Sequence, residues 1–522
     1  MDNLKNTYIF LFILIYYLNI ESLKSQEYFN IRESFDGNNT LEFCKDITSL
    51  DDGYVVMGAF AWASDFQYHY GVLKLDREGN TLSKMLYFSD SLRNVELGRR
   101  NGCLNKNSVD NAFYNVGLSR RFIDDGIGVL DEGLIAKFDT SFNLIWMKYF
   151  RDRIDPVDSS FFFEHMKILE NDDLIIAGTL YKGNSSTSLL IKADSSGNEL
   201  WRKYYESGSL NQGLNVIPTP DGGFALSCFK WVFQGNTSHN YLIKTDSLGN
   251  EQWRRYIGGL YADGPLYLAN SPDSTIVGTY AYSDSLALPS SDSYNRIALV
   301  KYNLQGDKVF ERIYCETVLN RKVSSITPDS IGNFVIAGSN KFYPPLASYI
   351  YEGSLLMVDN TGDSVWYRQY RHPTTTVSFN HLYGVTAAGD GGFAAVGAIY
   401  GFYPDPLGQD IWVIKVDSMG CINFGDCWVG EKEQPLPQNQ TTTLSVYPNP
   451  ARDRIQIGFG PDEQLLPKTL NLFDSFGRLQ RSIYLAPGQC EADISGLTPG
   501  VYVVFASDER GNVGTSKFVV YE

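Results

Sequence analysis

The residues that most often carry catalysis are scattered in this sequence. It holds five histidines, and no pair of them has the spacing of a metal site or a metalloprotease. Glu164 and His165 are neighbours, but adjacent side chains on a strand point to opposite faces and make a poor acid–base pair. Nucleophile-elbow, phosphate-loop and EF-hand patterns do not occur. The sequence therefore indicates no catalytic residue, no metal site and no cofactor, and leaves open a site assembled from distant residues.

Aromatic residues are the clearest candidates for function, because they gather in loops between predicted strands. Five such loops span residues 61–70, 231–241, 280–295, 342–351 and 400–410. Exposed rings provide stacking area for sugars or protein partners at little entropic cost. The alternative is that these rings pack the loops against one another. The candidate ligand-binding residues are Trp62, Tyr68, Trp231, Tyr282, Tyr343 and Tyr403.

These loops belong to a repeated unit. The stretch LIKTDSLGNEQWRRY at 242–256 recurs in seven related copies, whose turn positions are 52 to 63 residues apart. Alternating apolar residues flank a tight turn, in which Asp or Asn hydrogen-bonds the backbone and Gly supplies a positive φ. The second copy has Phe142 in place of the glycine, which predicts a distorted turn there. The seven turn positions are Gly79, Phe142, Gly197, Gly249, Gly306, Gly362 and Gly420.

Each repeat contains four predicted strands, named a to d in chain order. A hairpin such as NDDLIIAGTL at 171–180 precedes most copies, and a short apolar run such as LNVIP at 214–218 precedes that hairpin. Four strands at this period, seven times over, predict an all-β protein with a seven-bladed β-propeller. An array of two-sheet sandwiches is the alternative. Four tryptophans at one place in the repeat are expected to pack between blades: Trp146, Trp201, Trp253 and Trp366.

The two ends of the repeat region are expected to close the ring together. The seventh copy has strands a, b and c, but its continuation CINFGDCW at 421–428 makes a poor fourth strand. The segment EYFNIRESF at 27–35 precedes the first strand a and resembles the outer strands. It is expected to complete the last blade, which removes an exposed sheet edge.

The first residues have the pattern of a secretory signal peptide. Lys5 precedes an apolar run, Tyr8 to Leu18, that is short for a membrane span, and the small residue Ser25 follows. We predict a signal peptide at 1–25 and the propeller at 26–427. No later segment reaches membrane-spanning length, so the mature chain is expected to have no membrane span.

Seven cysteines in an exported chain predict an oxidising compartment and at least one unpaired thiol. Cys421 and Cys427 bracket a short loop and are the first candidates for a disulfide. Cys44 and Cys103 hold comparable places in neighbouring repeats and are a second candidate pair. The formal net charge of −16, without a Lys/Arg run, argues against nucleic acid as a partner, because phosphate binding needs a basic surface.

The last eighty residues have a different character. The polar segment at 428–443 contains two prolines and is predicted to be a linker. Alternating strands with tight turns then predict a small antiparallel sandwich at 444–522. This region contains four distinctive motifs, which are YPNPARDRI at 447–455, DSFGR at 474–478, DISGLTPGVYVV at 493–504 and a Lys followed by aliphatic residues near 520.

Together and in this order, the four motifs resemble the type A sorting domain of the type IX secretion system, over about residues 444–522. The resemblance implies an immunoglobulin-like sandwich that directs passage across the outer membrane, with the secretion machinery as partner. It implies a secreted or cell-surface protein that travels through the periplasm of a Bacteroidetes-type bacterium. Gln26 as the first mature residue and the GC…GDC loop at 420–427 fit such cargo.

Two interpretations of function follow. The first is a secreted or surface-attached propeller that binds glycan or protein through its aromatic loops. The second is a secreted polysaccharide hydrolase or lyase with its site at the mouth of the propeller. Carboxylates and arginines converging at that mouth would favour the enzyme, whereas aliphatic and hydroxyl groups would favour binding.

Overall fold

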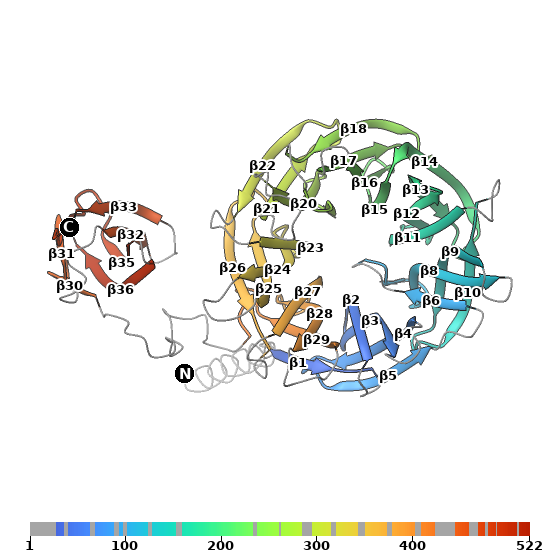
Figure 1. Cartoon of the computed structure of the whole chain (residues 1–522), viewed down its shortest axis with the longest axis horizontal. Coiled ribbons are helices and arrows are strands. Elements are labelled where there is room, and N and C mark those ends of the chain that lie inside the picture. Colours follow the sequence, from blue (N-terminus) through green and yellow to red (C-terminus); the bar gives the residue numbers. More distant parts are fainter. Residues whose placement is uncertain are drawn as a thin grey trace, which may run out of the picture. The chain divides into compact units, whose positions relative to one another are not determined.

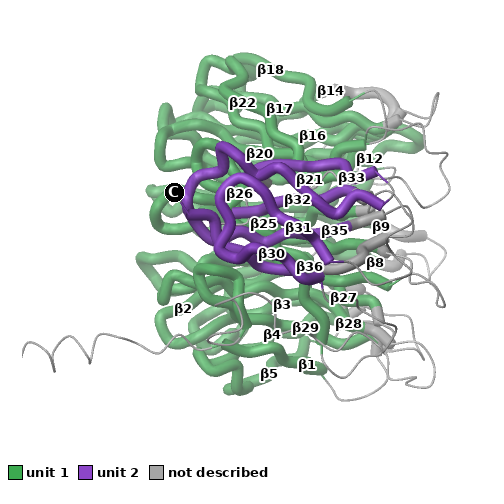
Figure 2. Tube along the Cα trace, turned by 90° about the vertical axis from the view of Figure 1, so that its left-hand side faces the viewer, with its two compact units in different colours: residues 1–429 green, residues 430–522 purple. Residues whose placement is uncertain are grey.

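The computed structural model divides into two compact units, residues 1–429 and residues 430–522 (Figure 2). Every regular element among the described residues is a β-strand. The described residues are 28–35, 40–62, 68–87, 93–97, 102–123, 128–152, 159–232, 237–259, 263–283, 295–314, 320–342, 350–372, 378–401, 409–422, 444–458, 468–474, 479–486, 488–508 and 511–521.

Unit 1 is a seven-bladed β-propeller, as the repeat predicts, with the blades arranged around one axis (Figure 1). Strand a of each blade is innermost and strand d is outermost. Blade 1 contains β2 (Thr40–Leu50), β3 (Gly53–Trp62), β4 (Tyr68–Asp76) and β5 (Thr81–Tyr87). In blade 2, β6 (Arg93–Leu97) and β7 (Asn105–Lys106) both pair with β8 (Phe113–Ile123), followed by β9 (Gly128–Phe138) and β10 (Leu144–Phe150).

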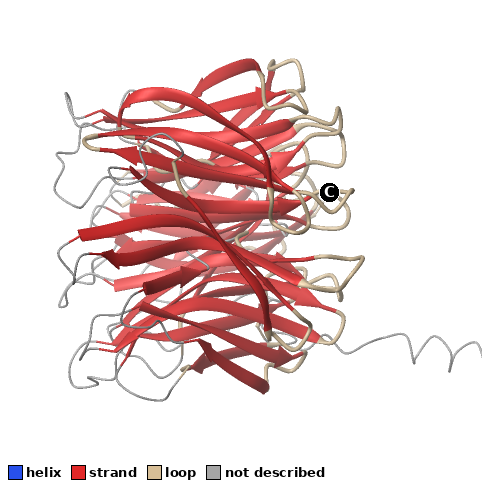
Figure 3. Ribbon diagram, turned by 90° about the vertical axis from the view of Figure 1, so that its right-hand side faces the viewer, coloured by secondary structure: helices blue, strands red, loops and turns tan. Residues whose placement is uncertain are grey.

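The next three blades are regular. Blade 3 contains β11 (Ser159–Ile168), β12 (Leu174–Lys182), β13 (Ser185–Ala193) and β14 (Glu199–Ser209). Blade 4 contains β15 (Asn211–Pro218), β16 (Phe224–Val232), β17 (Thr237–Thr245) and β18 (Glu251–Ile257). Blade 5 contains β19 (Tyr267–Asn270), β20 (Ile276–Ser283), β21 (Asn295–Tyr302) and β22 (Lys308–Tyr314). The strands run between the two faces of the ring, and tight turns lie along one of them (Figure 3).

The last two blades close the ring. Blade 6 contains β23 (Asn320–Pro328), β24 (Phe334–Phe342), β25 (Ile350–Val358) and β26 (Ser364–Tyr370). Blade 7 contains β27 (Ser378–Ala387), β28 (Phe393–Gly401) and β29 (Gln409–Val416), and its outer strand is β1 (Phe29–Glu33). β1 runs antiparallel to β29, with Ile31 opposite Val413, and the indole Nε1 of Trp412 donates to Asn30 Oδ1 at 2.8 Å. The N-terminal strand thus removes the edge that blade 7 would expose.

Buried apolar side chains join each blade to the next. Seven separate clusters of buried residues occupy the seven blade interfaces, one cluster for each pair of neighbours. Cys44 belongs to the cluster between blades 7 and 1, and Cys103 to the cluster between blades 2 and 3. Both are buried and neither forms a disulfide, so the expectation that they pair is wrong. The two cysteines lie at different interfaces, with the interface between blades 1 and 2 separating them.

A contact that recurs between neighbouring blades explains why the repeat turns share one shape. A Cβ added at Gly197 would lie 2.6 Å from the ring of Trp146, so the turn of blade 3 packs directly on the outer-strand indole of blade 2. The turn carbonyls are also bound, since Tyr205 Oη donates to Gly249 O at 2.6 Å across the next interface. The same aromatic contact recurs at Gly249 on Trp201, Gly306 on Trp253, Gly362 on Phe310, Gly420 on Trp366 and Gly79 on Phe29. The expected packing of the tryptophans between blades is confirmed.

The turn with Phe142 is regular, contrary to the expected distortion. Phe142 adopts a φ of 62°, its N–H donates to Asp139 O at 3.0 Å, and Asn143 N donates to Asp139 Oδ1 at 2.8 Å, as in the other copies. The reason lies in blade 1, where Ser83 occupies the place of the missing tryptophan. The Phe142 ring is buried and stacks on Phe113 with centroids 4.5 Å apart. At the interface between blades 1 and 2, the ring on the turn therefore fills the volume that a ring on the outer strand fills at the other interfaces.

The innermost strands share a second irregularity. Pairing between strands a and b slips by one residue in blades 1, 3, 4, 6 and 7, which leaves one bulged residue on strand a. These bulged residues are Lys45, Glu164, Leu214, Ser324 and Tyr383. A glycine faces the slip on strand b in four of the blades, and a Cβ at Gly338 would overlap the carbonyl oxygen of Lys322. A bulge redirects side chains locally, and here it does so around the propeller axis.

Unit 2 is a β-sandwich of the predicted immunoglobulin-like kind. One sheet contains β30 (Ser445–Tyr447), β31 (Arg454–Gly458) and β34 (Glu491–Asp493). The other contains β33 (Leu479–Leu485), β32 (Lys468–Asp474), β35 (Gly500–Asp508) and β36 (Gly511–Val520). The motif YPNPARDRI is joined to the last strand, since Val519 N donates to Asn449 Oδ1 at 2.9 Å and Ala451 N donates to Val519 O at 2.7 Å. The first and last motifs of this unit are thus one structural feature.

The compensation between Phe142 and Ser83 gives a stability prediction. Phe142→Gly should lower the free energy of unfolding by about 2–4 kcal/mol, because losing a buried ring outweighs the relief of the positive φ. Ser83→Trp in that background should restore part of the loss, since the pair then matches the other interfaces. Chemical denaturation of the two single variants and the double variant measures the coupling between the sites. Strictly additive effects would refute this account of the interface.

The bulges give a second prediction. Gly338→Ala should lower the free energy of unfolding by about 1–3 kcal/mol, because the new methyl group overlaps backbone that cannot move without straightening the bulge. Gly389→Ala is the matched control, since a Cβ there meets nothing within 4 Å. Equal thermal unfolding of the two variants would show that glycine is not required opposite the bulge.

Candidate functional site

A cavity of about 410 Å³ lies on the propeller axis, and we call it the mouth. It opens at the end of the ring where strands b lead into strands c, because Ala281 stands near the end of β20 and Asn295 begins β21. This is the face that carries the aromatic loops. Its lining residues are Lys45, Glu164, Gly264, Pro265, Tyr267, Ala281, Asn295, Arg321, Lys322, Val323, Ser324 and Tyr383.

Four of the five bulged residues line the mouth. They are Lys45, Glu164, Ser324 and Tyr383, contributed by blades 1, 3, 6 and 7. The bulge therefore brings a polar or aromatic side chain from each of these inner strands to one cavity. No loop is needed to hold these groups, because each sits within a hydrogen-bonded strand. The glycines opposite the bulges are the sequence signal that could have located these residues.

The described lining of the mouth is rich in cations and aromatic rings. The described lining contains one carboxylate, that of Glu164, and three cations, Lys45, Arg321 and Lys322. The Lys45 ammonium lies 5.9 Å from the centre of the Tyr383 ring, and the Lys322 ammonium lies 5.0 Å from the centre of the Tyr351 ring. At such distances the ring faces attract the cations. Rings thus hold two of the three positive groups in position.

Burial and neighbouring ammonium groups shift the pKa values of two side chains at this end of the channel. Desolvation and the nearby Lys341 ammonium lower the pKa of Lys322. Burial and the Lys322 ammonium lower the pKa of His381 to about 3, and its Nδ1 lies 2.9 Å from Ser339 Oγ. His381 is therefore neutral, and its ring stacks at 13° to that of Tyr383 with centroids 5.7 Å apart. A neutral, buried imidazole serves here as a support for the mouth's tyrosine.

Deeper in the channel, a second cavity of about 470 Å³ is bordered by inner strands of all seven blades. Its titratable groups join neighbouring blades. The Asp46 carboxylate accepts the N–H groups of Gly102, at 3.1 Å, and of Leu104, both in blade 2. His165 Nδ1 accepts the N–H of Val216, in blade 4, at 3.3 Å. Burial raises the pKa of Asp46 to about 7 and lowers that of His165, so these groups have structural partners rather than a free catalytic geometry.

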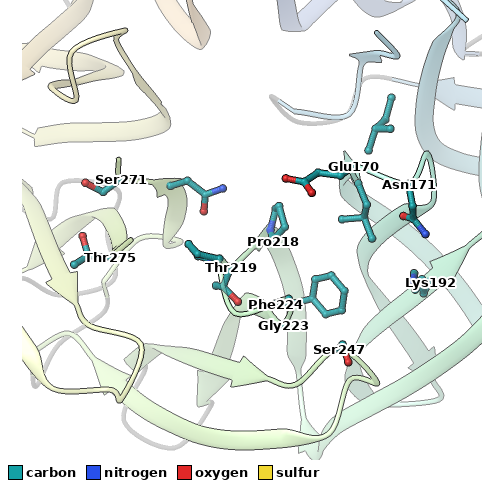
Figure 4. A pocket seen from close by; sticks show the side chains of 15 residues that line it. Glu170, Asn171, Lys192, Pro218, Thr219, Gly223, Phe224, Ser247, Ser271 and Thr275 are labelled. Carbon is teal, nitrogen blue, oxygen red and sulfur yellow. The ribbon is translucent and has the colours of Figure 1, made fainter. Parts of the chain in front are cut away.

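A third cavity, of about 610 Å³, lies between blades 3, 4 and 5 among the a–b turns (Figure 4). The turn polar groups around it are bonded to one another. Thr219 Oγ1 donates to an Asp221 carboxylate oxygen at 2.6 Å, and the Lys244 ammonium lies 2.8 Å from the same carboxylate. Lys192 pairs with Asp173 at 2.9 Å. This cavity is a space between turns, and it lies on the face opposite the mouth.

Of the six aromatic residues predicted from the loops, the structure describes the side chains of two. Trp231, on β16, and Tyr282, on β20, are both half-buried, and the Arg296 guanidinium lies 5.6 Å from the Tyr282 ring centre. Neither belongs to the lining of the mouth. The side chains of Trp62, Tyr68, Tyr343 and Tyr403 lie outside the described residues. Their role in ligand binding stays a prediction.

The remaining site predictions have a similar outcome. Cys421 is buried and is not among the free thiols, whereas Cys427 lies outside the described residues, so their pairing stays a prediction. No group of three His, Cys, Asp or Glu side chains in the described part of the chain could hold a metal ion. In that same part, no helix is long and apolar enough to cross a membrane.

Comparison with known proteins identifies the second unit. Residues 445–521 match the family of secretion system C-terminal sorting domains. No curated protein matches the sequence. The match covers the strands of the sandwich and the four motifs described above.

Solved structures resemble the chain only distantly. A protein of unknown function from Dyadobacter fermentans shares 12% identity at a TM-score of 0.39, over 63% of this chain and 98% of that one. The β-propeller domain of the Trilobed protease from Pyrococcus furiosus shares 10% at 0.39, over 72% and 93%. The polysaccharide lyase Uly1 shares 8% at 0.44, over 76% and 93%. Likeness at this level carries no argument about the ligand.

The sorting domain settles how the protein is exported. Its sequence matches the family over nearly all of unit 2, and its strands form the sandwich that the motifs predict. The chain is therefore cargo of the type IX secretion system, and its C-terminal sorting domain directs it to the cell surface or out of the cell.

Proposed function

We propose that this exported propeller binds glycan at the mouth. The observation that carries the proposal is the composition of the lining, where the rings of Tyr267 and Tyr383 stand beside the amide of Asn295 and the hydroxyl of Ser324. Sugars present apolar ring faces edged by hydroxyl groups, and a concave site with rings and a few polar groups matches both. The loop residues Trp62, Tyr68, Trp231, Tyr282, Tyr343 and Tyr403 are proposed to extend this surface.

The way the mouth is built supports binding without rearrangement. Its bulged residues lie on inner strands, whose partners are fixed by the blade interfaces on either side. A site formed in advance loses little side-chain entropy when a ligand binds. Tyr383 is held by its stacking on His381, so its ring is presented in one orientation.

The described lining does not favour a hydrolase. Most glycoside hydrolases need two carboxyl groups on either side of the scissile bond. Glu164 is the one carboxylate in the described part of the mouth, and Asp46 lies in the deeper cavity with its oxygens bonded to blade 2. The described lining brings Glu164 and Arg321 to one cavity but lacks the second carboxyl group that such catalysis requires.

Replacing the mouth tyrosines tests the proposal. Tyr267→Ala and Tyr383→Ala should each weaken glycan binding roughly fivefold, about 1 kcal/mol, because each loses a stacking surface. Tyr204→Ala is the control, since this half-exposed ring lies on outer strand β14. A glycan array probed with the full secreted protein identifies the ligands, and titration gives the affinities. If the wild-type protein binds no glycan, or the three variants bind alike, glycan binding at the mouth is wrong.

The export route has its own prediction. Deleting residues 444–522 should leave the protein in the periplasm, because the family match places the sorting signal in that segment. The propeller should still fold, since unit 1 has its own closed ring and seven interface clusters. Cell fractionation and thermal unfolding of the truncated chain measure the two effects separately. A truncated chain that reaches the surface as efficiently as the full protein would contradict the assignment.

A further inference from the structure

We propose that the glycan bound at the mouth is acidic, with carboxylate or sulfate groups held by Lys45 and Lys322 beside the buried charge of Arg321. This inference rests on the proposed glycan function and adds the chemical class of the ligand. It follows from the charge, the position and the burial of the side chains in the mouth.

The charge of the mouth is opposite to that of the chain. The whole sequence carries a formal net charge of −16, yet the described lining has three cations and one carboxylate. A cavity lined by residues of this chain's average composition would be acidic, so the excess of cations in the mouth calls for an explanation. A cleft of one sign focuses the field and raises the local concentration of ligands of the other sign.

The three cations differ in how they could meet a ligand. Arg321 is buried, and its guanidinium lies 5.0 Å from the centre of the Tyr367 ring, which fixes its plane. Lys322 is exposed on the next position of the same strand, and Lys45 contributes to the lining from blade 1. The buried guanidinium adds positive charge to the wall of the cavity, whereas the two ammonium groups, each of which lies over a tyrosine ring, can meet an anion directly. Together they can contact anionic groups on successive sugars.

Crowding of like charges supports the same conclusion. Lys322 lies near Lys341, and after burial the Lys341 ammonium contributes to lowering the pKa of Lys322. Glu164, from blade 3, is the carboxylate that shares the cavity, and it is buried. The acidic residues of the adjoining strands pair elsewhere, as Glu352 does with Arg371. An anionic ligand would therefore reduce the repulsion between the ammonium groups of Lys322 and Lys341.

The tyrosines favour a glycan over an acidic peptide. Tyr267 and Tyr383 line the same cavity as the cations, so a ligand that contacts the charges also meets two aromatic rings. A uronate or a sulfated sugar offers a ring face and an anion within one residue. An acidic peptide offers the charge without the stacking face, and it serves as the competing ligand in the test.

Matched polysaccharides separate this inference from the function on which it rests. The full-length secreted protein is titrated with dextran sulfate against dextran, and with polygalacturonate against its methyl ester, because each pair shares a backbone and differs in charge. We expect binding to at least one charged member to be about tenfold or more tighter than to its neutral partner, and to weaken with salt. The pair that shows the difference identifies sulfate or carboxylate as the preferred group.

Each other result overturns a defined claim. Equal binding of charged and neutral members overturns the acidic ligand and leaves glycan binding intact. Failure to bind any glycan on these probes or on the array overturns both. Binding of poly-L-glutamate as tight as that of the best acidic polysaccharide overturns the glycan in favour of an acidic peptide.

Charge variants locate the interaction. Lys45→Gln and Lys322→Gln should each weaken binding of the acidic polysaccharide several-fold, while Lys203→Gln, on outer strand β14, should leave it unchanged. Glu164→Gln should strengthen binding, because it removes the one carboxylate of the described lining at nearly constant shape. A gain in affinity cannot come from unfolding, so this variant decides the matter even if a lysine variant folds poorly. Unchanged or weaker binding by Glu164→Gln would overturn the placement of the anion at the mouth.

Discussion

The contact between an outer-strand ring of one blade and the turn of the next is the interaction on which this propeller depends. Trp146 against Gly197 is the pattern, and it recurs around the ring with Trp or Phe on one side and glycine on the other. The ring needs a flat surface without a Cβ, and the tight turn needs a residue with positive φ, so one glycine satisfies both requirements. The exception at Phe142 and Ser83 shows that the required quantity is filled volume at the interface, which either side can supply.

Because the outer contacts fix the blades relative to one another, the inner strands can be irregular. Five of them contain a bulge, and opposite four of the bulges a glycine lets the backbone of strand a approach. The same structural device that interrupts the pairing turns Lys45, Glu164, Ser324 and Tyr383 toward one cavity. The site is therefore assembled from strands of blades 1, 3, 5, 6 and 7, which are far apart in sequence. This explains why no local sequence motif indicates the site.

The charged groups of the channel lie in two regions and have different roles. In the deeper part, Asp46 and His165 bond to the backbone of neighbouring blades and hold the ring together. At the mouth, Lys45, Lys322 and two tyrosines line a cavity open to a ligand, and the buried Arg321 adds positive charge to its wall. The chain as a whole is acidic, so the positive mouth stands out from the surface that surrounds it. Export by the type IX route places this mouth outside the cell, where polysaccharides are met.

The sequence by itself determined the seven repeats, the strand order within a blade and the sorting domain, because turn chemistry, alternation and ordered motifs are local. The aromatic loops also indicated the face on which the proposed site lies, although Trp231 and Tyr282, the predicted residues whose side chains are described, do not line the mouth. The tertiary structure alone decided which residues meet on the axis. It also decided that Cys44 and Cys103 stay apart, and that Phe142 replaces a tryptophan from another blade. These outcomes depend on neighbours about fifty residues away and on a one-residue slip in register, and a slip of one residue moves a side chain to the opposite face without changing the local sequence pattern.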